Sequence, residues 1–190
     1  MKIRNRLSLL FTFITASILL AFASVIYLSA IENREKEFYA SLKKEAVTKA
    51  NLFLNAKVDS KTLQSIYKNN RATLNEVEVA IYNTSFNLLY HDAVNIDVVK
   101  ETKPMLDKII QQKELQFYQK DWQVVGLKYK FQEKNYVITA AAYDEYGYKK
   151  LQNLRQNIII VFIISILFIY IAGRFFSKKA FEPRCRQCKH

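Results

Sequence analysis

The sequence has few of the residues from which catalytic and metal-binding sites are usually built. It contains three glycines, two histidines and two cysteines in 190 residues. The glycines, Gly126, Gly147 and Gly173, stand singly, so no glycine-rich loop can offer successive backbone N–H groups to a phosphate. No paired carboxylates, nucleophile elbow or HExxH motif stands out. The sequence therefore gives no support to an enzyme, and we expect neither a catalytic residue nor a cofactor.

Cysteine is absent from the whole central part of the chain. Cys185 and Cys188 both lie near the C-terminus, so no disulfide framework holds the middle together, and roughly 120 residues must bury a core of their own. The run CRQCKH supplies three metal ligands at most and lies in a cationic tail that opposes a metal dication. We interpret this arrangement of cysteines and histidine at the C-terminus as a chance occurrence and expect no metal site.

Charge is missing from two long stretches, residues 7–31 and 156–173. Each is about long enough, as a helix, to cross the ~30 Å hydrocarbon core of a bilayer. The alternative for the first is a cleavable signal peptide, but its apolar region is too long and Leu28-Ser29-Ala30 is a mediocre cleavage site. The alternative for the second is a buried helix, but the run has no polar face. We expect two transmembrane helices.

The net charge of +12 invites a nucleic-acid interpretation, but most of the excess flanks the two apolar stretches. Basic residues close to span ends indicate the cytoplasmic side of a membrane. They are Lys2, Arg4 and Arg6 before the first span, and Arg174, Lys178 and Lys179 after the second. We therefore expect membrane lipid rather than nucleic acid as the partner. The predicted order is a cytoplasmic leader (1–6), a first span (7–31), an extracytoplasmic domain (32–155), a second span (156–173) and a cytoplasmic tail (174–190).

Helical spacing dominates the start of the predicted outside domain. Phe38, Leu42, Ala46, Ala50 and Phe53 share one face, and no glycine or proline separates them from the first span. One continuous helix to about Val58 is the simplest prediction, and two helices with a kink near residues 31–35 are the alternative. A short helix follows, capped by Asp59 or Ser60.

Alternating apolar residues then predict an antiparallel sheet of about five strands. A hairpin covers residues 77–82 and 86–91, and the remaining strands cover 115–122, 125–131 and 136–143. Pro104 can begin a helix that runs to Gln112. Asp144 can cap a helix over 149–155 that enters the second span without a breaker. The predicted class is α+β, with a long N-terminal helix and two transmembrane helices flanking the domain.

A binding pocket would lie between the sheet and its covering helices. Polar or aromatic positions there are Tyr90, Tyr129, Tyr136 and Thr139. His91, at a predicted strand end, could sense pH or hold a ligand, and the alternative is a surface histidine beside Asp92.

The chain resembles the N-terminal input half of a bacterial two-component sensor histidine kinase of the Bacteroidetes type. The resemblance is carried by the basic leader and first span, by YVITAAAYDEYGYKKLQNLR (136–155), by the second span, and by GRFFSKKAFEP (173–183), which is similar to the start of a HAMP linker. It implies a PAS-like periplasmic domain in the bacterial inner membrane, a homodimer, and a small ligand or periplasmic partner. It also implies relay positions at Asp144, Gly173, Glu182 and Pro183.

After Pro183 the sequence departs from that family, because RCRQCKH replaces the second linker helix and the phosphoacceptor region. A truncated or frameshifted reading frame is the expected account, and no kinase activity can be assigned to any residue here. Two alternatives stay open: a non-signalling membrane-anchored binding or scaffolding protein, and a fragment of a chemoreceptor-type receptor.

Overall fold

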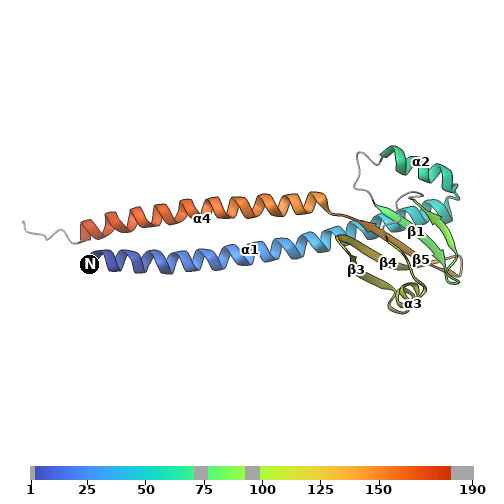
Figure 1. Cartoon of the computed structure of the whole chain (residues 1–190), viewed down its shortest axis with the longest axis horizontal. Coiled ribbons are helices and arrows are strands. Elements are labelled where there is room, and N and C mark those ends of the chain that lie inside the picture. Colours follow the sequence, from blue (N-terminus) through green and yellow to red (C-terminus); the bar gives the residue numbers. More distant parts are fainter. Residues whose placement is uncertain (1–2, 71–76, 93–98, 181–190) are drawn as a thin grey trace, which may run out of the picture. The chain divides into compact units, whose positions relative to one another are not determined.

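The computed structural model describes residues 3–70, 77–92 and 99–180. It divides into two compact units, one formed by Asn33–Tyr148 and the other by Met1–Glu32 with Lys149–His190. Two long helices run through both units: α1 (Ile3–Ala50) and α4 (Glu145–Ala180) (Figure 1). The predicted continuous helix is thus confirmed as far as Ala50, where a π-helical turn, Asn51–Asn55, follows.

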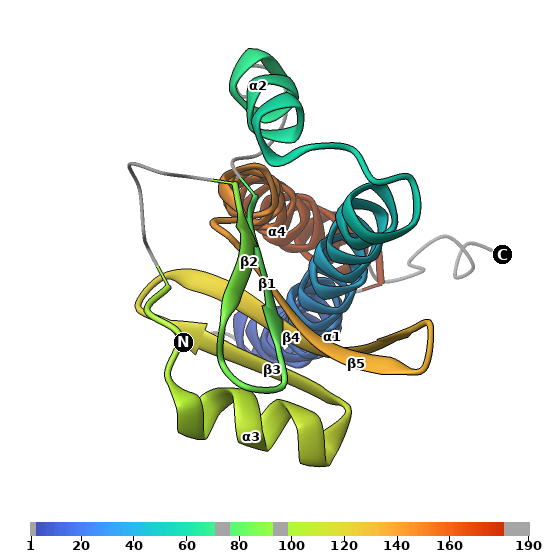
Figure 2. The same ribbon diagram turned by 90° about the vertical axis from the view of Figure 1, so that its right-hand side faces the viewer.

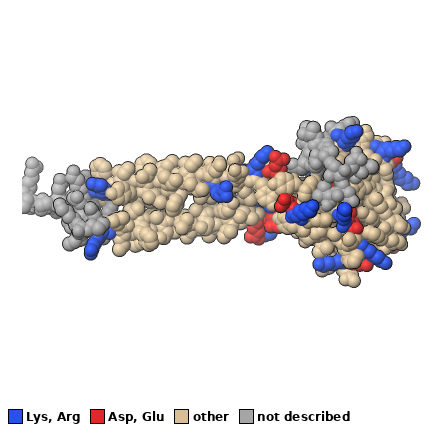
Figure 3. All heavy atoms as spheres, in the orientation of Figure 1, with Lys and Arg blue, Asp and Glu red and all other residues tan. Residues whose placement is uncertain are grey.

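The first unit contains the apolar parts of α1 and α4. Both helices are long and apolar enough to cross a membrane, with mean hydropathies of 2.4 and 2.6 over their most apolar windows. Charged side chains are sparse along these parts and gather over the other unit (Figure 3). The two helices line a cavity of about 280 Å³ that is open to the outside. Its lining residues are Leu19, Phe22, Ala23, Ile26, Asn157, Ile158, Val161, Phe162 and Ser165.

The second unit is built on one antiparallel sheet. Its strands are β1 (Glu78–Asn83), β2 (Leu88–His91), β3 (Glu114–Gln119), β4 (Trp122–Phe131) and β5 (Lys134–Ala142). Their order across the sheet is β2-β1-β5-β4-β3. The five-stranded antiparallel sheet predicted from the sequence is confirmed. Trp122 is a correction: a turn at Lys120, whose φ is 55°, places it at the start of β4 instead of the end of β3.

Alternation along the strands gives the sheet two apolar faces, and Figure 2 shows α1 on one side of the sheet and α3 on the other. One face carries Val79, Ile81 and Ile138 and packs against Leu42 and Ala46 of α1, so the predicted buried face of the long helix is confirmed. The other face packs against α3 (Lys103–Gln112), through Leu106 and Ile109. We call these the α1 face and the α3 face.

Side-chain caps set the starts of two helices. Asp59 accepts a hydrogen bond from the Thr62 N–H (3.0 Å) before α2 (Ser60–Asn70), as predicted. Hydrogen bonds from the Thr62 hydroxyl and from its N–H hold the pKa of the Asp59 carboxyl below its usual value. Asp144 caps α4 in the same way, accepting from the Gly147 N–H at 2.8 Å. Helix α4 therefore begins at Glu145, four residues before the predicted start, and β5 ends only three residues earlier, at Ala142.

Candidate functional site

Period-two alternation brings a group of polar side chains onto the α3 face. On β1, Glu78 and Tyr82 point to the side opposite Val79 and Ile81. Between them lies Ala80, which is paired with His91 of β2 on one side and with Thr139 of β5 on the other. Glu78, Tyr82, His91 and Thr139 therefore share one face across three neighbouring strands.

A fifth polar residue, Glu101, comes from the segment that crosses this face before α3. Val99 is buried against Val124 and Ala141 and fixes the segment on the sheet. Two residues later, the Glu101 carboxylate accepts a hydrogen bond from the Thr139 hydroxyl (2.5 Å) and one from the Tyr82 hydroxyl (3.1 Å). We call Glu78, Tyr82, His91, Glu101 and Thr139 the α3-face cluster.

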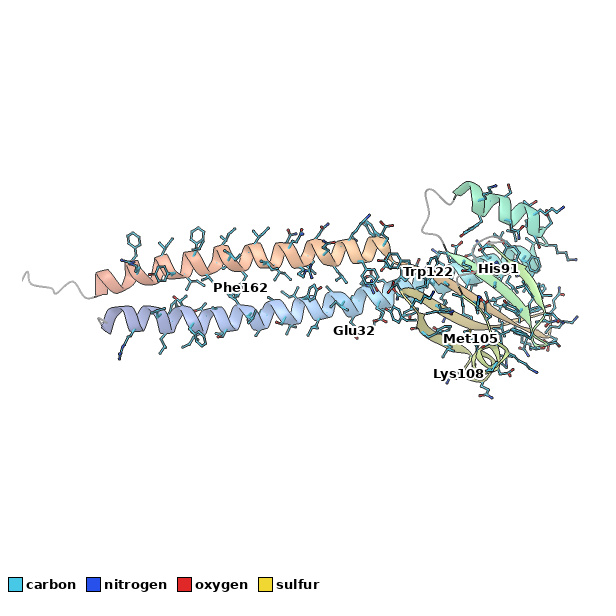
Figure 4. The ribbon with its side chains drawn as sticks, in the orientation of Figure 1. Glu32, His91, Met105, Lys108, Trp122 and Phe162 are labelled. Carbon is cyan, nitrogen blue, oxygen red and sulfur yellow. The ribbon has the colours of Figure 1, made fainter. Side chains whose placement is uncertain are left out.

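A contact between His91 and Glu78 closes the cluster at the end of β2. His91 Nε2 lies 2.9 Å from Glu78 Oε1, and the two side chains are only 15% and 6% exposed. The backbone of His91 is held from outside the sheet, because the Gln64 amide of α2 donates to its carbonyl at 2.8 Å. His91 is thus positioned by three elements, β1, β2 and α2 (Figure 4).

The electrostatics of the cluster favour the uptake of positive charge. Burial raises the pKa of the Glu101 carboxyl; hydrogen bonds from Thr139 and Tyr82 oppose this, and the nearby Glu78 carboxylate adds to the rise. The Glu101 carboxylate, which is largely removed from water, is stabilised by a proton or by a ligand that donates hydrogen bonds. In the described part of the chain, no group of three or more His, Cys, Asp or Glu side chains is placed to hold a metal ion.

The α1 face carries a different polar group, which ties α1 to the sheet. The Asp92 carboxylate accepts hydrogen bonds from the Lys49 ammonium, the Tyr90 hydroxyl and the Val79 N–H. Burial raises the pKa of Asp92 against the opposing effect of Lys49, and burial also raises the pKa of Tyr90. The Lys49 ammonium lies 4.6 Å from the ring centre of Tyr67 of α2. Each donor and acceptor here has a partner, which is the pattern of a structural link.

The structure does not bring the five predicted pocket residues together. His91 and Thr139 lie in the α3-face cluster, whereas Tyr90, Tyr129 and Tyr136 lie on the α1 face. The Tyr129 hydroxyl donates to Asn51 in the π-helical turn at 2.5 Å, and Tyr136 packs against the same core. A single pocket on one face of the sheet cannot include all five.

The predicted relay positions are described in part. Asp144 caps α4 and Gly173 lies within it, whereas Glu182 and Pro183 lie outside the described residues.

Sequence reasoning missed Glu78, Tyr82 and Glu101. Val79 and Ile81 of β1, with Val77 just before it, form the apolar face, so Glu78 and Tyr82 had the positions of solvent-facing residues. They are buried because α3 and the segment before it cover that face, which strand periodicity alone does not reveal. The available signal was the small residue Ala80 between them, since a short side chain leaves room for a covering layer.

No known protein family, curated protein or solved structure matches this chain.

Proposed function

We propose that the chain is the signal-sensing module of a bacterial two-component sensor histidine kinase, anchored in the inner membrane by α1 and α4. The unit Asn33–Tyr148 is its periplasmic domain, and both termini are cytoplasmic. One observation carries the proposal. The last strand of the domain, β5, ends at Ala142, and α4, which is itself long and apolar enough to span a membrane, begins at Glu145.

The topology supports a PAS-like domain. A single antiparallel sheet of order β2-β1-β5-β4-β3 is covered on one face by the long N-terminal helix and crossed on the other by α3, which connects β2 to β3. The N- and C-terminal elements of such a domain are the two helices that enter the membrane. A change within the domain can therefore act on a span without passing through a flexible linker.

The α3-face cluster is where we place the entry of the signal. Thr139, which donates to Glu101, lies on β5, the strand that leads directly into α4. A small ligand or a group of a periplasmic partner that replaces this hydrogen bond would act on β5 itself. A coupling of about 1–3 kcal/mol between the two sites is enough to change an output several-fold.

A homodimer formed through α1 and the spans is the expected assembly. Within one chain, Ile158 and Phe162 line the cavity against α1 (Phe162 is labelled in Figure 4). A cysteine at either position, combined with one on the α1 side of the cavity, therefore reports on the contact between α4 and α1 of the same chain.

Helical phase tests the proposal without a known ligand. Residues 1–183 are joined to the linker helix and kinase domains of a characterised sensor kinase, and autophosphorylation is measured in membrane vesicles. One to four alanines are then inserted between Tyr148 and Lys149, within α4. Each added alanine rotates the part of α4 that follows it by about 100° relative to the part that precedes it. Output should change most with one or two alanines and return toward the starting level with four.

The matched control places the same alanines between Gln132 and Glu133, at the exposed turn between β4 and β5. These insertions should leave output unchanged. A flat response to all four insertions in α4, in fusions that are inserted and folded, would contradict the proposal and favour a non-signalling anchored scaffold.

A further inference from the structure

Arg34 stands just past the boundary between the two units, inside the domain. Its side chain is only 12% exposed. The guanidinium carbon lies 4.1 Å from the ring centre of Tyr148, and Nη1 lies 3.4 Å from Asp144 Oδ2. That separation is longer than the 2.7–2.9 Å of a charge-assisted hydrogen bond. Among the described residues, neither Nε nor Nη1 of Arg34 has a hydrogen-bond partner, although both atoms are buried.

The carboxylate that Arg34 faces is also the one that begins α4. Asp144 Oδ1 accepts from the Gly147 N–H at 2.8 Å, and the Asp144 carbonyl accepts from the Tyr148 N–H at 3.1 Å. The side chain of Asp144 is 6% exposed. One buried carboxylate thus fixes the first turn of α4 and faces a cation on α1.

Gly147 is required by this carboxylate rather than by backbone conformation. Its φ is not positive, but a Cβ atom there would lie 2.6 Å from Asp144 Cγ and closer still to one of its oxygens. The first turn of α4 is therefore closed tightly around the Asp144 side chain.

A second imperfectly paired polar group lies on β4, opposite Ala142 at the end of β5. Gln123 of β4 is fully buried, and neither of its amide atoms forms a hydrogen bond of good geometry with another described residue. Its neighbour Tyr39 of α1 donates instead to the Phe117 carbonyl at 3.1 Å. Burial raises the pKa of Tyr39, and the nearby Gln123 amide opposes this rise; Arg34 and Tyr148 are also close enough to influence it. Both groups lie where α1 enters the domain and α4 leaves it.

Buried donors without partners are rare in folded proteins, and each one calls for a physical explanation. We propose that Arg34 and Asp144 form a two-position joint that sets the starting position of α4. In the position seen here, Asp144 caps α4 and Arg34 holds it only by a long contact. In the second position, a small shift of the first turn of α4 brings Asp144 Oδ2 from 3.4 Å to the distance of a charge-assisted hydrogen bond from Nη1. Arg34 is then the positioning residue through which α1 and α4 are linked, a role that rests on the proposed signalling function.

Disulfide formation between the two spans tests the joint. The pair Ala23→Cys and Phe162→Cys, which lines the cavity between α1 and α4, is placed in the full chain with Cys185→Ser and Cys188→Ser, in membrane vesicles. Arg34→Gln removes the charge of one partner. Asp144→Asn removes the charge of the other but keeps an oxygen that can cap α4. Each should change the rate of disulfide formation by about fivefold, the lower end of ordinary couplings between sites.

Because both substitutions break the same pair, their combination should have the effect of either one alone. Lys43→Gln is the matched control. Lys43 lies on α1, as Arg34 does, but it forms an exposed ion pair with Glu114 of β3 (2.5 Å), so the substitution does not alter α4. Rates for Arg34→Gln and Asp144→Asn equal to that of Lys43→Gln, in proteins with unchanged thermal unfolding, would overturn the joint. So would additive effects in the combined variant.

The alanine insertions in α4 separate this inference from the proposed function. A periodic response to the insertions together with unaltered disulfide rates leaves the sensor module standing and removes the joint. A flat response to the insertions removes the signalling function, and the joint with it.

Discussion

Glu101 links two strands of the sheet and also makes the stability of the domain depend on pH. Its carboxylate links β1 and β5 through the hydroxyls of Tyr82 and Thr139, and burial raises its pKa above the ordinary 4.5. Because the folded state binds the proton more tightly than the unfolded chain, the resulting stability is complete below pH 4.5. It is lost as pH rises through the folded-state pKa.

Glu101→Gln should therefore be less stable than the wild type at low pH, and this deficit in unfolding free energy should shrink as pH rises. The free energy of unfolding of the wild type minus that of the variant should fall steadily from pH 4.5 upward, because glutamine does not titrate. The measurement is urea unfolding of the full chain in detergent micelles, followed by the fluorescence of Trp122, the only tryptophan. Glu114→Gln is the control: its pKa is lowered, chiefly by the hydrogen bond from Lys43, so its contribution is instead lost as pH falls. A difference that rises with pH for Glu101→Gln would contradict this account.

The ion pair between Lys49 and Asp92 gives a second prediction at this scale. Asp92→Asn leaves the buried Lys49 ammonium without its counter-charge, which should cost about 3–5 kcal/mol of unfolding free energy. Lys49→Met should cost a similar amount. The two together should cost clearly less than the sum, because no buried charge remains. Urea unfolding followed at Trp122 measures all three, and a fully additive double variant would show that the pair is not coupled.

Residue by residue, the sequence predicted caps better than binding sites. Asp59 and Asp144 were identified as caps because a capping residue and its helix lie next to each other in sequence. The α3-face cluster joins Glu78, Glu101 and Thr139 from three separate segments. Their meeting depends on strand order and on the crossing segment, so no local pattern could have revealed it.

At the scale of elements, the distance between α3 and the sheet is set by one glycine of β4, Gly126. A Cβ atom at Gly126 of β4 would lie 2.6 Å from Ile109 Cγ1, so α3 can approach the sheet only over a glycine. This close packing holds α3 and the Glu101 segment over the α3 face.

Gly126→Ala should therefore destabilise the domain by overpacking, at a cost of about 1–3 kcal/mol. Ile109→Ala alone should cost about 2–5 kcal/mol through the cavity it leaves. In the double variant the new methyl group occupies part of that cavity, so its cost should fall below the sum of the two. Thermal unfolding of the three variants checks this, and strict additivity would mean that the two residues do not press on each other.

Element types were well predicted and their ends were not. The long helix and the strands follow from periodicities of 3.6 and 2, which the apolar residues repeat several times. The start of β4 at Trp122 depends on the positive φ of Lys120, a turn without glycine that sequence patterns do not mark. The start of α4 at Glu145 depends on the close packing of Asp144 against Gly147. The sequence shows both residues, but it does not show that they are in contact.

At the scale of the whole molecule, the two charge-free stretches carried most of the prediction. The helices that contain them are long and apolar enough to span a membrane, and their identity needs only composition and length. What passes between domain and membrane could not be predicted in the same way. In our proposal it depends on the contact of Arg34 with Asp144, two residues that are far apart in the chain.

The most direct test of signalling is whether a change on the α3 face reaches the span of α4. In the full chain with Cys185→Ser and Cys188→Ser, the rate of disulfide formation between Ala23→Cys and Phe162→Cys is compared with and without Glu101→Gln, in membrane vesicles. Glu101 lies in the domain and neither cysteine does. We predict that neutralising Glu101 changes the rate by about fivefold or more. Equal rates in two folded, membrane-inserted proteins would contradict the claim that the domain acts on α4.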